Sequence, residues 1–206
     1  MAVRAPRDVA LAARGGHVRA RELEGSSLSE AFHQPRVAVS PARAVERTLI
    51  EGLFQFYAHD FSEFAAPEST AFEFNEAGRF FDYPHMDTYW RDAERWPLLI
   101  RIDARVAGFA LVNTLSHCGE AIDRNMAEFF VARHYRRHGN ASEAARLIFE
   151  MHPGRWEVAV AVRNLPAISF WPKAIGHAPN VSQIRQREQS DERWRGPIWH
   201  FHAAKP

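Results

Sequence analysis

One segment of the chain, from Glu128 to Ala141, carries residue types that could bind a phosphate group. An apolar run ends at Val131, a basic turn covers Arg136 to His138, and Gly139 precedes a helical pattern. The first turn of a helix presents backbone N–H groups without partners and the positive end of the helix dipole, and both favour an anion. Glycine also lets a bulky anion come close to the backbone. The segment therefore predicts a phosphate-binding turn, and the alternative is a basic surface turn that ends at a glycine.

The elements around this turn follow a pattern of alternating strands and helices. Two apolar runs at 98–102 and 107–112 are joined by a short polar turn, which is typical of a β-hairpin. Alternating or apolar runs predict further strands, and apolar spacings of three and four predict helices. Strands are expected at 126–131, 156–162, 181–187 and 198–202, and helices at 142–151 and 166–174.

The region before the hairpin is predicted to hold a short strand at 37–39 and two helices. Ser40-Pro41 has the residue types of an N-cap followed by proline at the first helical position. A second helix would cover 85–96 and end at Pro97. Four apolar residues of the first helix share one face: Val45, Leu49, Leu53 and Phe56. Together the elements predict a mixed α/β domain of the α+β type.

Length and composition fit one domain with an N-terminal extension. The chain has 206 residues and 46% of them are hydrophobic, which suffices for a buried core without disulfides. Residues 1–35 are rich in Ala, Arg, Gly and Ser and show no lasting apolar period, so they are predicted to form a flexible extension. The folded domain is expected to cover 36–206.

Charge and cysteine content argue against several classes of protein. The formal net charge of +1 gives no reason to expect nucleic acid or an anionic membrane as a partner. No apolar run approaches the roughly 20 residues that span a bilayer. The single cysteine, Cys118, cannot form an intramolecular disulfide, which fits a cytoplasmic protein. His200 and His202 share one face of a predicted strand, but no cysteine or acid pair stands near them, so no metal site is expected.

Three motifs, in their order along the chain, resemble the GNAT superfamily of N-acetyltransferases. The basic turn matches the Arg-x-x-Gly-x-Gly/Ala pyrophosphate loop, with Ala141 in place of the second glycine. Asn164-Leu165-Pro166-Ala167 with Phe170-Trp171 resembles the family's later strand-to-helix motif, and Ala107-Gly108-Phe109-Ala110 resembles its central hairpin. The resemblance covers about residues 37–178 and extends to a bacterial group of predicted acetyltransferases. It implies a central mixed, mostly antiparallel sheet flanked by helices, and acetyl-CoA as cosubstrate.

The resemblance also implies where acetyl-CoA binds. A cleft would open where the strand that contains Val131 separates from the strand that contains Val158. The turn would hold the pyrophosphate, the pantetheine arm would pair with the first strand, and an N–H group near Val131 would polarise the thioester carbonyl. The implied cofactor-binding residues are Phe129, Phe130, Val131, Arg136, Arg137, His138, Gly139, Asn140, Ala141, Asn164 and Trp171.

Glu128 is the candidate general base, because some family members place a glutamate on the strand just before the cofactor-binding segment. An attacking amine must lose a proton, which a carboxylate can accept. Strand alternation puts Glu128 and Phe130 on one face and Phe129 and Val131 on the other. The alternative is a hydrogen-bonded sheet carboxylate without a catalytic role.

The chain departs from the family pattern at Trp171, where many relatives have a tyrosine that protonates the leaving thiolate. Indole is a poor acid at neutral pH, so Trp171 is expected to pack against the pantetheine arm. The thiolate then leaves unprotonated or takes its proton from another group. The candidate donors are His134, Tyr135, Ser169 and His177.

The acceptor is expected beside the first helices and the loop from 60 to 89. Acids and aromatics alternate there, and such a mixture suits a cationic amine through charge and cation–π contact. The alternative is a solvated loop whose phenylalanines pack on the sheet. The acids are Asp60, Glu63, Glu68, Glu73, Glu76, Asp82 and Asp87, and the aromatics are Phe72, Phe74, Phe80, Phe81 and Tyr83.

The leading hypothesis is therefore an enzyme that moves the acetyl group of acetyl-CoA to an amine of a small-molecule acceptor. The amine would attack directly in a ternary complex. One alternative is a GNAT-like module that binds acyl-CoA as a sensor or regulator without turnover, and another is an interaction domain that binds no CoA. Family members often dimerise through late strands, so a homodimer is also expected.

Overall fold

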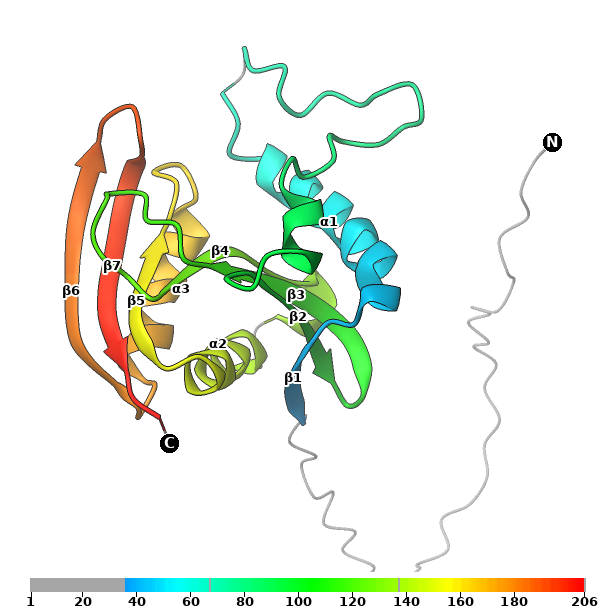
Figure 1. Cartoon of the computed structure of the whole chain (residues 1–206). Coiled ribbons are helices and arrows are strands. Elements are labelled where there is room, and N and C mark those ends of the chain that lie inside the picture. Colours follow the sequence, from blue (N-terminus) through cyan, green and yellow to red (C-terminus); the bar gives the residue numbers. More distant parts are fainter. Residues whose placement is uncertain (1–35, 67, 137, 206) are drawn as a thin grey trace, which may run out of the picture. The chain divides into compact units, whose positions relative to one another are not determined.

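The computed structural model describes residues 36–66, 68–136 and 138–205, which form a seven-stranded sheet with helices on both faces (Figure 1). The strand order is β1-β2-β3-β4-β5-β7-β6, and all neighbours but one pair are antiparallel. The predicted mixed, mostly antiparallel sheet flanked by helices is confirmed. The extension predicted for residues 1–35 and the predicted phosphate ligand Arg137 lie outside the described residues.

The bounds of the elements agree with most of the predicted ranges. The strands are β1 (Val37–Pro41), β2 (Trp96–Ile102), β3 (Arg105–Asn113), β4 (Arg124–Val131), β5 (Gly154–Ala159), β6 (Val181–Ser190) and β7 (Arg195–Ala203). The α-helices are α1 (Arg47–Ser62), α2 (Asn140–Met151) and α3 (Leu165–Gly176), and the 3-10 helices are η1 (Ala44–Glu46), η2 (Met86–Trp90) and η3 (Arg133–Tyr135). In the described part of the chain, no helix is both long and apolar enough to cross a bilayer.

β2 and β3 form the predicted hairpin. Two residues, Asp103 and Ala104, make the turn, and their φ angles are 50° and 65°. Positive φ at both central residues is the geometry of a type I′ turn, whose twist matches that of the paired strands. The apolar runs on either side are almost fully buried because helices cover both faces of this part of the sheet.

The sheet forks between β4 and β5. These two strands run parallel, and only Arg124↔Trp156 and Asn125↔Glu157 lie in register. Beyond Asn125 they separate, while β4 stays paired with β3 and β5 with β7 along almost their full lengths. The remainder of β4 therefore has no strand partner on its β5 side.

α1 covers one face of the sheet, and its buried side differs from the predicted one. Ile50, Phe54 and Ala58 are buried against the sheet. The predicted stripe of Val45, Leu49, Leu53 and Phe56 is wrong, because Val45 and Phe56 are 81% and 66% exposed. Apolar residues occur on two sides of this helix, and contact with the sheet selects the side that contains Phe54.

Both helices predicted before the hairpin have the wrong bounds, because some of their residues belong to β1 and β2. β1 continues through Pro41, so Ser40-Pro41 is strand and α1 begins only at Arg47, after η1. The predicted helix at 85–96 is the short η2, and Pro97 lies within β2. The Pro97 carbonyl accepts the Ala42 N–H at 2.8 Å, just past the end of β1. Proline is tolerated there because no strand residue requires its missing N–H.

α2 and α3 cover the opposite face, where the aromatic core is largest. The ring of Phe149 in α2 lies 5.1 Å from that of Trp156 in β5 and 4.9 Å from that of Phe201 in β7. All three side chains are buried. The Trp156 Nε1–H donates to the His152 carbonyl at 2.8 Å, so this large ring is buried without an unsatisfied donor.

Gly108 of β3 approaches β4 so closely that a side chain does not fit. A Cβ atom there would lie 1.9 Å from the Phe130 carbonyl oxygen. We expect Gly108→Ala to lower the free energy of unfolding by about 1–3 kcal/mol, since the backbone of β4 must move. The control is Gly52→Ala in α1, where a Cβ meets no atom within 4 Å and helix propensity predicts a gain of about 1 kcal/mol. Urea unfolding measures both, and a Gly108→Ala protein as stable as the wild type would contradict the close approach.

Candidate functional site

A cavity of about 350 Å³ lies in the fork between β4 and β5. One wall carries aromatic side chains from α1 and from the loop before η2. The other walls come from the second part of β4, from β5 and the residues that follow it, and from the start of α3. Both the segment of Glu128 and Val158 line this space, as the family resemblance implied.

The edge of β4 at this cavity directs backbone polar groups into the fork. The Ala132 N–H donates to the Ala107 carbonyl at 2.8 Å. Antiparallel strands alternate between hydrogen-bonded and non-hydrogen-bonded pairs, so Phe130 is also bonded to β3. The N–H and C=O groups of Phe129 and Val131 consequently point to the opposite side, away from β3. This is the arrangement that an added strand-like ligand would require.

A β-bulge at Ala127 determines the direction of the Glu128 side chain. Consecutive residues of β3 stand opposite Glu128 and Met126, so Ala127 is an extra residue in β4. Bulges interrupt the alternation of side chains and re-aim them. Met126 packs with the core beneath α2 and α3, whereas Glu128 and Phe130 face the α1 side. The predicted shared face of Glu128 and Phe130 agrees with this.

The Glu128 carboxyl lies in the cavity wall, and its pKa is raised. Burial raises the pKa of its carboxyl to about 7, although hydrogen bonds from Tyr57 and Tyr83 and the nearby charge of His117 act to lower it. Among the described residues that line the cavity, it is the sole carboxylate. A perturbed pKa in a cavity is typical of functional sites, and a carboxylate of this pKa can accept a proton near neutral pH.

The predicted phosphate turn lies at the N-terminus of α2. Gly139 is the N-cap and has a φ of 76°, a conformation that favours glycine. It has no side chain with which to cap the helix, so the first N–H groups of α2, those of Asn140 and Ala141, point outward from the helix end. The buried Asn140 side chain donates to the Tyr135 carbonyl at 3.0 Å and closes the turn, while His138 is exposed.

Arg136 is folded back from the turn onto the protein. Its Nε donates to the Val131 carbonyl at 2.6 Å, and its guanidinium pairs with Asp60 of α1. Arg133 also pairs with Asp60, at 2.9 Å. Burial alone would raise the pKa of Asp60, but the two arginines outweigh it and the pKa is lowered. Arg136 therefore ties the turn to α1, and its backbone N–H donates to the Arg133 carbonyl at 3.2 Å.

Asn164 and Trp171 occupy the α3 side of the cavity. The side-chain oxygen Oδ1 of Asn164 caps α3 by accepting the Ala167 N–H at 3.1 Å, and Asn164 lines the cavity. Trp171 is buried, and its ring centroid lies 5.1 Å from that of Phe129. Both aromatic residues line the cavity and make this wall apolar.

The proton donors suggested by the sequence are not among the described residues that line the cavity. Instead, Tyr57, Tyr83 and His117 lie there. The sequence named Tyr83 only among the aromatics of the acceptor loop and missed the other two: Tyr57 could have been found from the correct buried side of α1, but no local pattern distinguishes His117. The suggested donors were His134, Tyr135, Ser169 and His177, and all of them except Tyr135 are exposed.

The loop expected to bind the acceptor contributes rings to the cavity but no carboxylate. Phe72, Phe81 and Tyr83 line the cavity, Phe80 is buried beneath them, and Phe74 is exposed. The phenylalanines therefore divide between the two interpretations left open by the sequence, since some pack in the core and others face the cavity.

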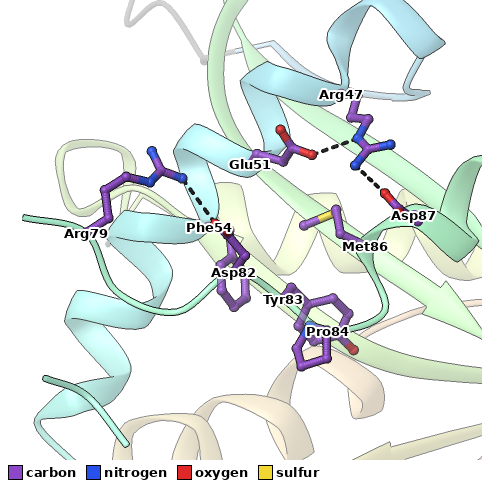
Figure 2. Close-up of a pocket in the computed structure, with 9 residues that line it drawn as sticks. All are labelled: Arg47, Glu51, Phe54, Arg79, Asp82, Tyr83, Pro84, Met86 and Asp87. Atoms are coloured by element: carbon purple, nitrogen blue, oxygen red, sulfur yellow. Dashed lines mark hydrogen bonds and ion pairs between the residues drawn. The ribbon is translucent and has the colours of Figure 1, made fainter. Parts of the chain in front are cut away.

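A second cavity, of about 400 Å³, shares Phe54, Tyr83 and Pro84 with the first (Figure 2). Figure 2 shows two sets of ion pairs on either side of these apolar residues. The acids of this region are thus paired with arginine. The paired residues are Arg79 with Asp82, and Arg47 with Glu51 and Asp87.

The forked sheet with the cavity in its fork, together with the glycine-initiated helix, defines an acetyltransferase fold. The model of the acetyltransferase (GNAT) family matches residues 52–177, and the chain belongs to this family. No curated protein matches the sequence.

Solved structures with this fold are distant in sequence. An acetyltransferase from Thermus thermophilus is 13% identical, with a TM-score of 0.57 over 84% of this chain and 100% of that chain. The aminoglycoside acetyltransferase AAC(6')-Ib, solved with coenzyme A, is 12% identical, with a TM-score of 0.53 over 82% of this chain and 95% of that chain. Spermidine N-acetyltransferase from Vibrio cholerae, solved with CoA and spermine, is 10% identical, with a TM-score of 0.50 over 81% and 95%. At these identities the likeness concerns the fold alone.

The raised pKa of Glu128 makes a prediction about stability. A group with a raised folded pKa contributes its full stability below the unfolded pKa and loses it as the pH rises through the folded value. Glu128→Gln resembles the protonated side chain, so we expect little difference from the wild type below pH 4.5 and a gain of up to about 3 kcal/mol at pH 8. Urea unfolding at both pH values measures this, and an equal effect at both would contradict the raised pKa.

Proposed function

We propose that this protein transfers the acetyl group of acetyl-CoA to an amine of a small-molecule acceptor. The observation that carries the proposal is the position of Glu128. Its carboxyl, with a pKa of about 7, lines the cavity of the fork. The apolar ring of Trp171 and the backbone groups that β4 directs into the fork border the same cavity.

The cosubstrate is assigned to the fork and to the start of α2. The pyrophosphate binds the outward N–H groups from Gly139 to Ala141, where the helix dipole favours negative charge. The pantetheine arm pairs with the edge of β4 at Phe129 and Val131 and packs against Trp171. His138, which is exposed, and Asn164, which lines the cavity, belong to the same predicted set.

Glu128 acts as the general base in this proposal. Alkyl amines are protonated at neutral pH, since their pKa is about 10, and only the neutral amine can attack. The amine nitrogen forms a bond to the acetyl carbon, Glu128 takes the proton directly or through water, and the C–S bond breaks to release the CoA thiolate. The Val131 N–H, which points into the fork, stabilises the negative charge on the carbonyl oxygen.

The cavity favours a cationic acceptor with an apolar or aromatic part. Rings such as Phe61, Phe81 and Tyr83 face it, and Glu128 supplies its negative charge. A cation near such rings gains about 0.5–2 kcal/mol from cation–π contact. The names of two proteins with this fold, a spermidine N-acetyltransferase and an aminoglycoside acetyltransferase, also indicate amine acceptors.

Gly139 allows the cofactor site to be tested without unfolding the protein. Aspartate tolerates the left-handed conformation better than most residues and is a good N-cap, and a Cβ at Gly139 meets no atom within 4 Å. We expect Gly139→Asp to abolish the rise in melting temperature that acetyl-CoA and free CoA give, because its carboxylate repels the pyrophosphate. Gly139→Asn, the neutral control with the same backbone cost, should keep most of the rise.

Two outcomes would change the proposal. If acetyl-CoA stabilises neither the wild type nor Gly139→Asn, the cofactor site is wrong. If acetyl-CoA binds but no amine in a library releases CoA, the protein is an acyl-CoA-binding module instead. ATP serves as the control for unspecific binding of a polyphosphate.

The pKa of Glu128 predicts how the rate of catalysis depends on pH. We expect kcat/KM with a reactive amine to rise with pH through about 7, as Glu128 ionises, in addition to the ionisation of the amine itself. Glu128→Gln should lower kcat by about 10²–10⁴-fold and leave the binding of acetyl-CoA intact. Glu76→Gln, the same change at an exposed residue that does not line the cavity, is the control and should match the wild type. A Glu128→Gln enzyme with wild-type kcat would assign the base elsewhere.

A further inference from the structure

Three metal-ligand side chains converge beside the cavity, in a cluster that the proposed acetyl transfer does not use: Cys118, Glu157 and His200. Cys118 follows β3 in a loop, Glu157 lies in β5 and His200 in β7. Glu157 is completely buried, His200 is almost completely buried, and Cys118 is half-buried. The absence of a cysteine near His200 in the sequence argued against a metal site, but the fold brings Cys118 there from 82 residues away.

The distances within this cluster are close to those between ligands of one tetrahedral ion. Cys118 Sγ lies 3.4 Å from Glu157 Oε2 and 3.5 Å from His200 Nε2, and these last two atoms are 3.2 Å apart. Tetrahedral zinc, with Zn–S of about 2.3 Å and Zn–N and Zn–O of about 2.0–2.1 Å, requires ligand separations of roughly 3.3–3.5 Å. The three atoms therefore form one face of such a tetrahedron.

The cluster does not have the arrangement of a cysteine nucleophile with its histidine base. In that arrangement the thiol contacts one ring nitrogen and the carboxylate orients the ring through the other. Here Cys118 and Glu157 both approach Nε2 of His200. The buried Nδ1 atom of His200 has no hydrogen-bond partner among the described residues. All three ligand atoms lie close to one another instead.

Neighbouring groups hold the Glu157 carboxylate in place, as outer-shell partners do at metal sites. The Ser116 hydroxyl donates to Oε2 at 2.7 Å. The His117 backbone N–H lies 2.7 Å from Oε1, and His117 Nδ1 lies 2.9 Å from the same atom. These contacts fix the carboxylate and leave Oε2 facing the sulfur and the imidazole.

We propose that Cys118, Glu157 and His200 bind one divalent transition-metal ion of the zinc class. The thiolate, imidazole and carboxylate set suits zinc, and the two negative ligands balance its charge. A water molecule takes the fourth position, because the nearest further carboxylate, Glu120, is paired with Arg185 and Arg187. The ion joins the loop after β3 to β5 and β7, and thereby holds His117 at the wall of the cavity.

Cobalt titration tests this proposal, because Co²⁺ occupies zinc sites and its bond to a thiolate absorbs in the near ultraviolet. The full-length protein, freed of metal by a chelator under reducing conditions, should take up one equivalent of Co²⁺ with a thiolate charge-transfer band. Zn²⁺ should displace the cobalt and remove the band. Cys118→Ser should lose the band and bind Zn²⁺ at least about tenfold more weakly. His202→Ala, a control two residues along the same strand, should behave as the wild type.

The design separates metal binding from folding and from acetyl transfer. Circular dichroism without metal checks that Cys118→Ser folds, and His200→Gln is a second ligand variant that should also bind Zn²⁺ more weakly. Zn²⁺ should raise the melting temperature of the wild type by a few degrees and not that of Cys118→Ser. A wild type that takes up no stoichiometric Co²⁺, or a Cys118→Ser protein with the wild-type spectrum and affinity, overturns the proposal. Every readout is made without acetyl-CoA, so the result is independent of the proposed enzyme activity.

Discussion

The structure depends on one constraint, which is that β4 and β5 stay paired at only two positions, Arg124↔Trp156 and Asn125↔Glu157. Parallel strands that separate expose backbone N–H and C=O groups along their edges, and such groups require partners. On β4 these groups point away from β3 toward the fork, where Arg136 Nε donates to the Val131 carbonyl at 2.6 Å. The fork thus supplies both a space and an edge of hydrogen-bonding groups, and in the proposed function the pantetheine arm takes the place of the missing strand.

Buried polar side chains gather at the base of this fork, where backbone pairing ends. The Asn125 side chain donates to Asn113 at 3.1 Å, and the Asn113 side chain donates to the Tyr89 hydroxyl at 3.3 Å. On the other branch, Glu157 is both the last β5 residue in register with β4 and the centre of the cluster with Cys118. Burying a polar group without a partner destabilises the fold. The hydrogen-bond networks of Asn125 on β4 and of Glu157 on β5 therefore favour one arrangement of each strand.

Local sequence patterns were sufficient where neighbours in sequence are also neighbours in space. The hairpin, β4, α2 and the glycine turn between the last two were predicted because each depends on a few consecutive residues. The buried side of α1 was not, since apolar residues lie on two of its sides and only the sheet selects Phe54. The position of His117 in the cavity wall, and the approach of Cys118 to His200, depend on loops and strands that meet only in the folded chain.

The bulge at Ala127 determines where the Glu128 carboxyl lies, and the burial of that carboxyl lowers the stability of the fold. If residues 126–128 formed a regular strand without the bulge, alternation would put Glu128 on the same face as Met126, in the apolar core beneath α2 and α3. With it, Glu128 reaches Tyr57 and Tyr83, whose hydroxyls compensate only part of the burial, and its pKa stays near 7. A solvated carboxylate would not lower the stability of the folded protein, but it would be a weaker base. In the proposed function, the aromatic wall therefore both suits a cationic acceptor and makes Glu128 a better base, and the loss of stability from a buried ionisable group accompanies both properties.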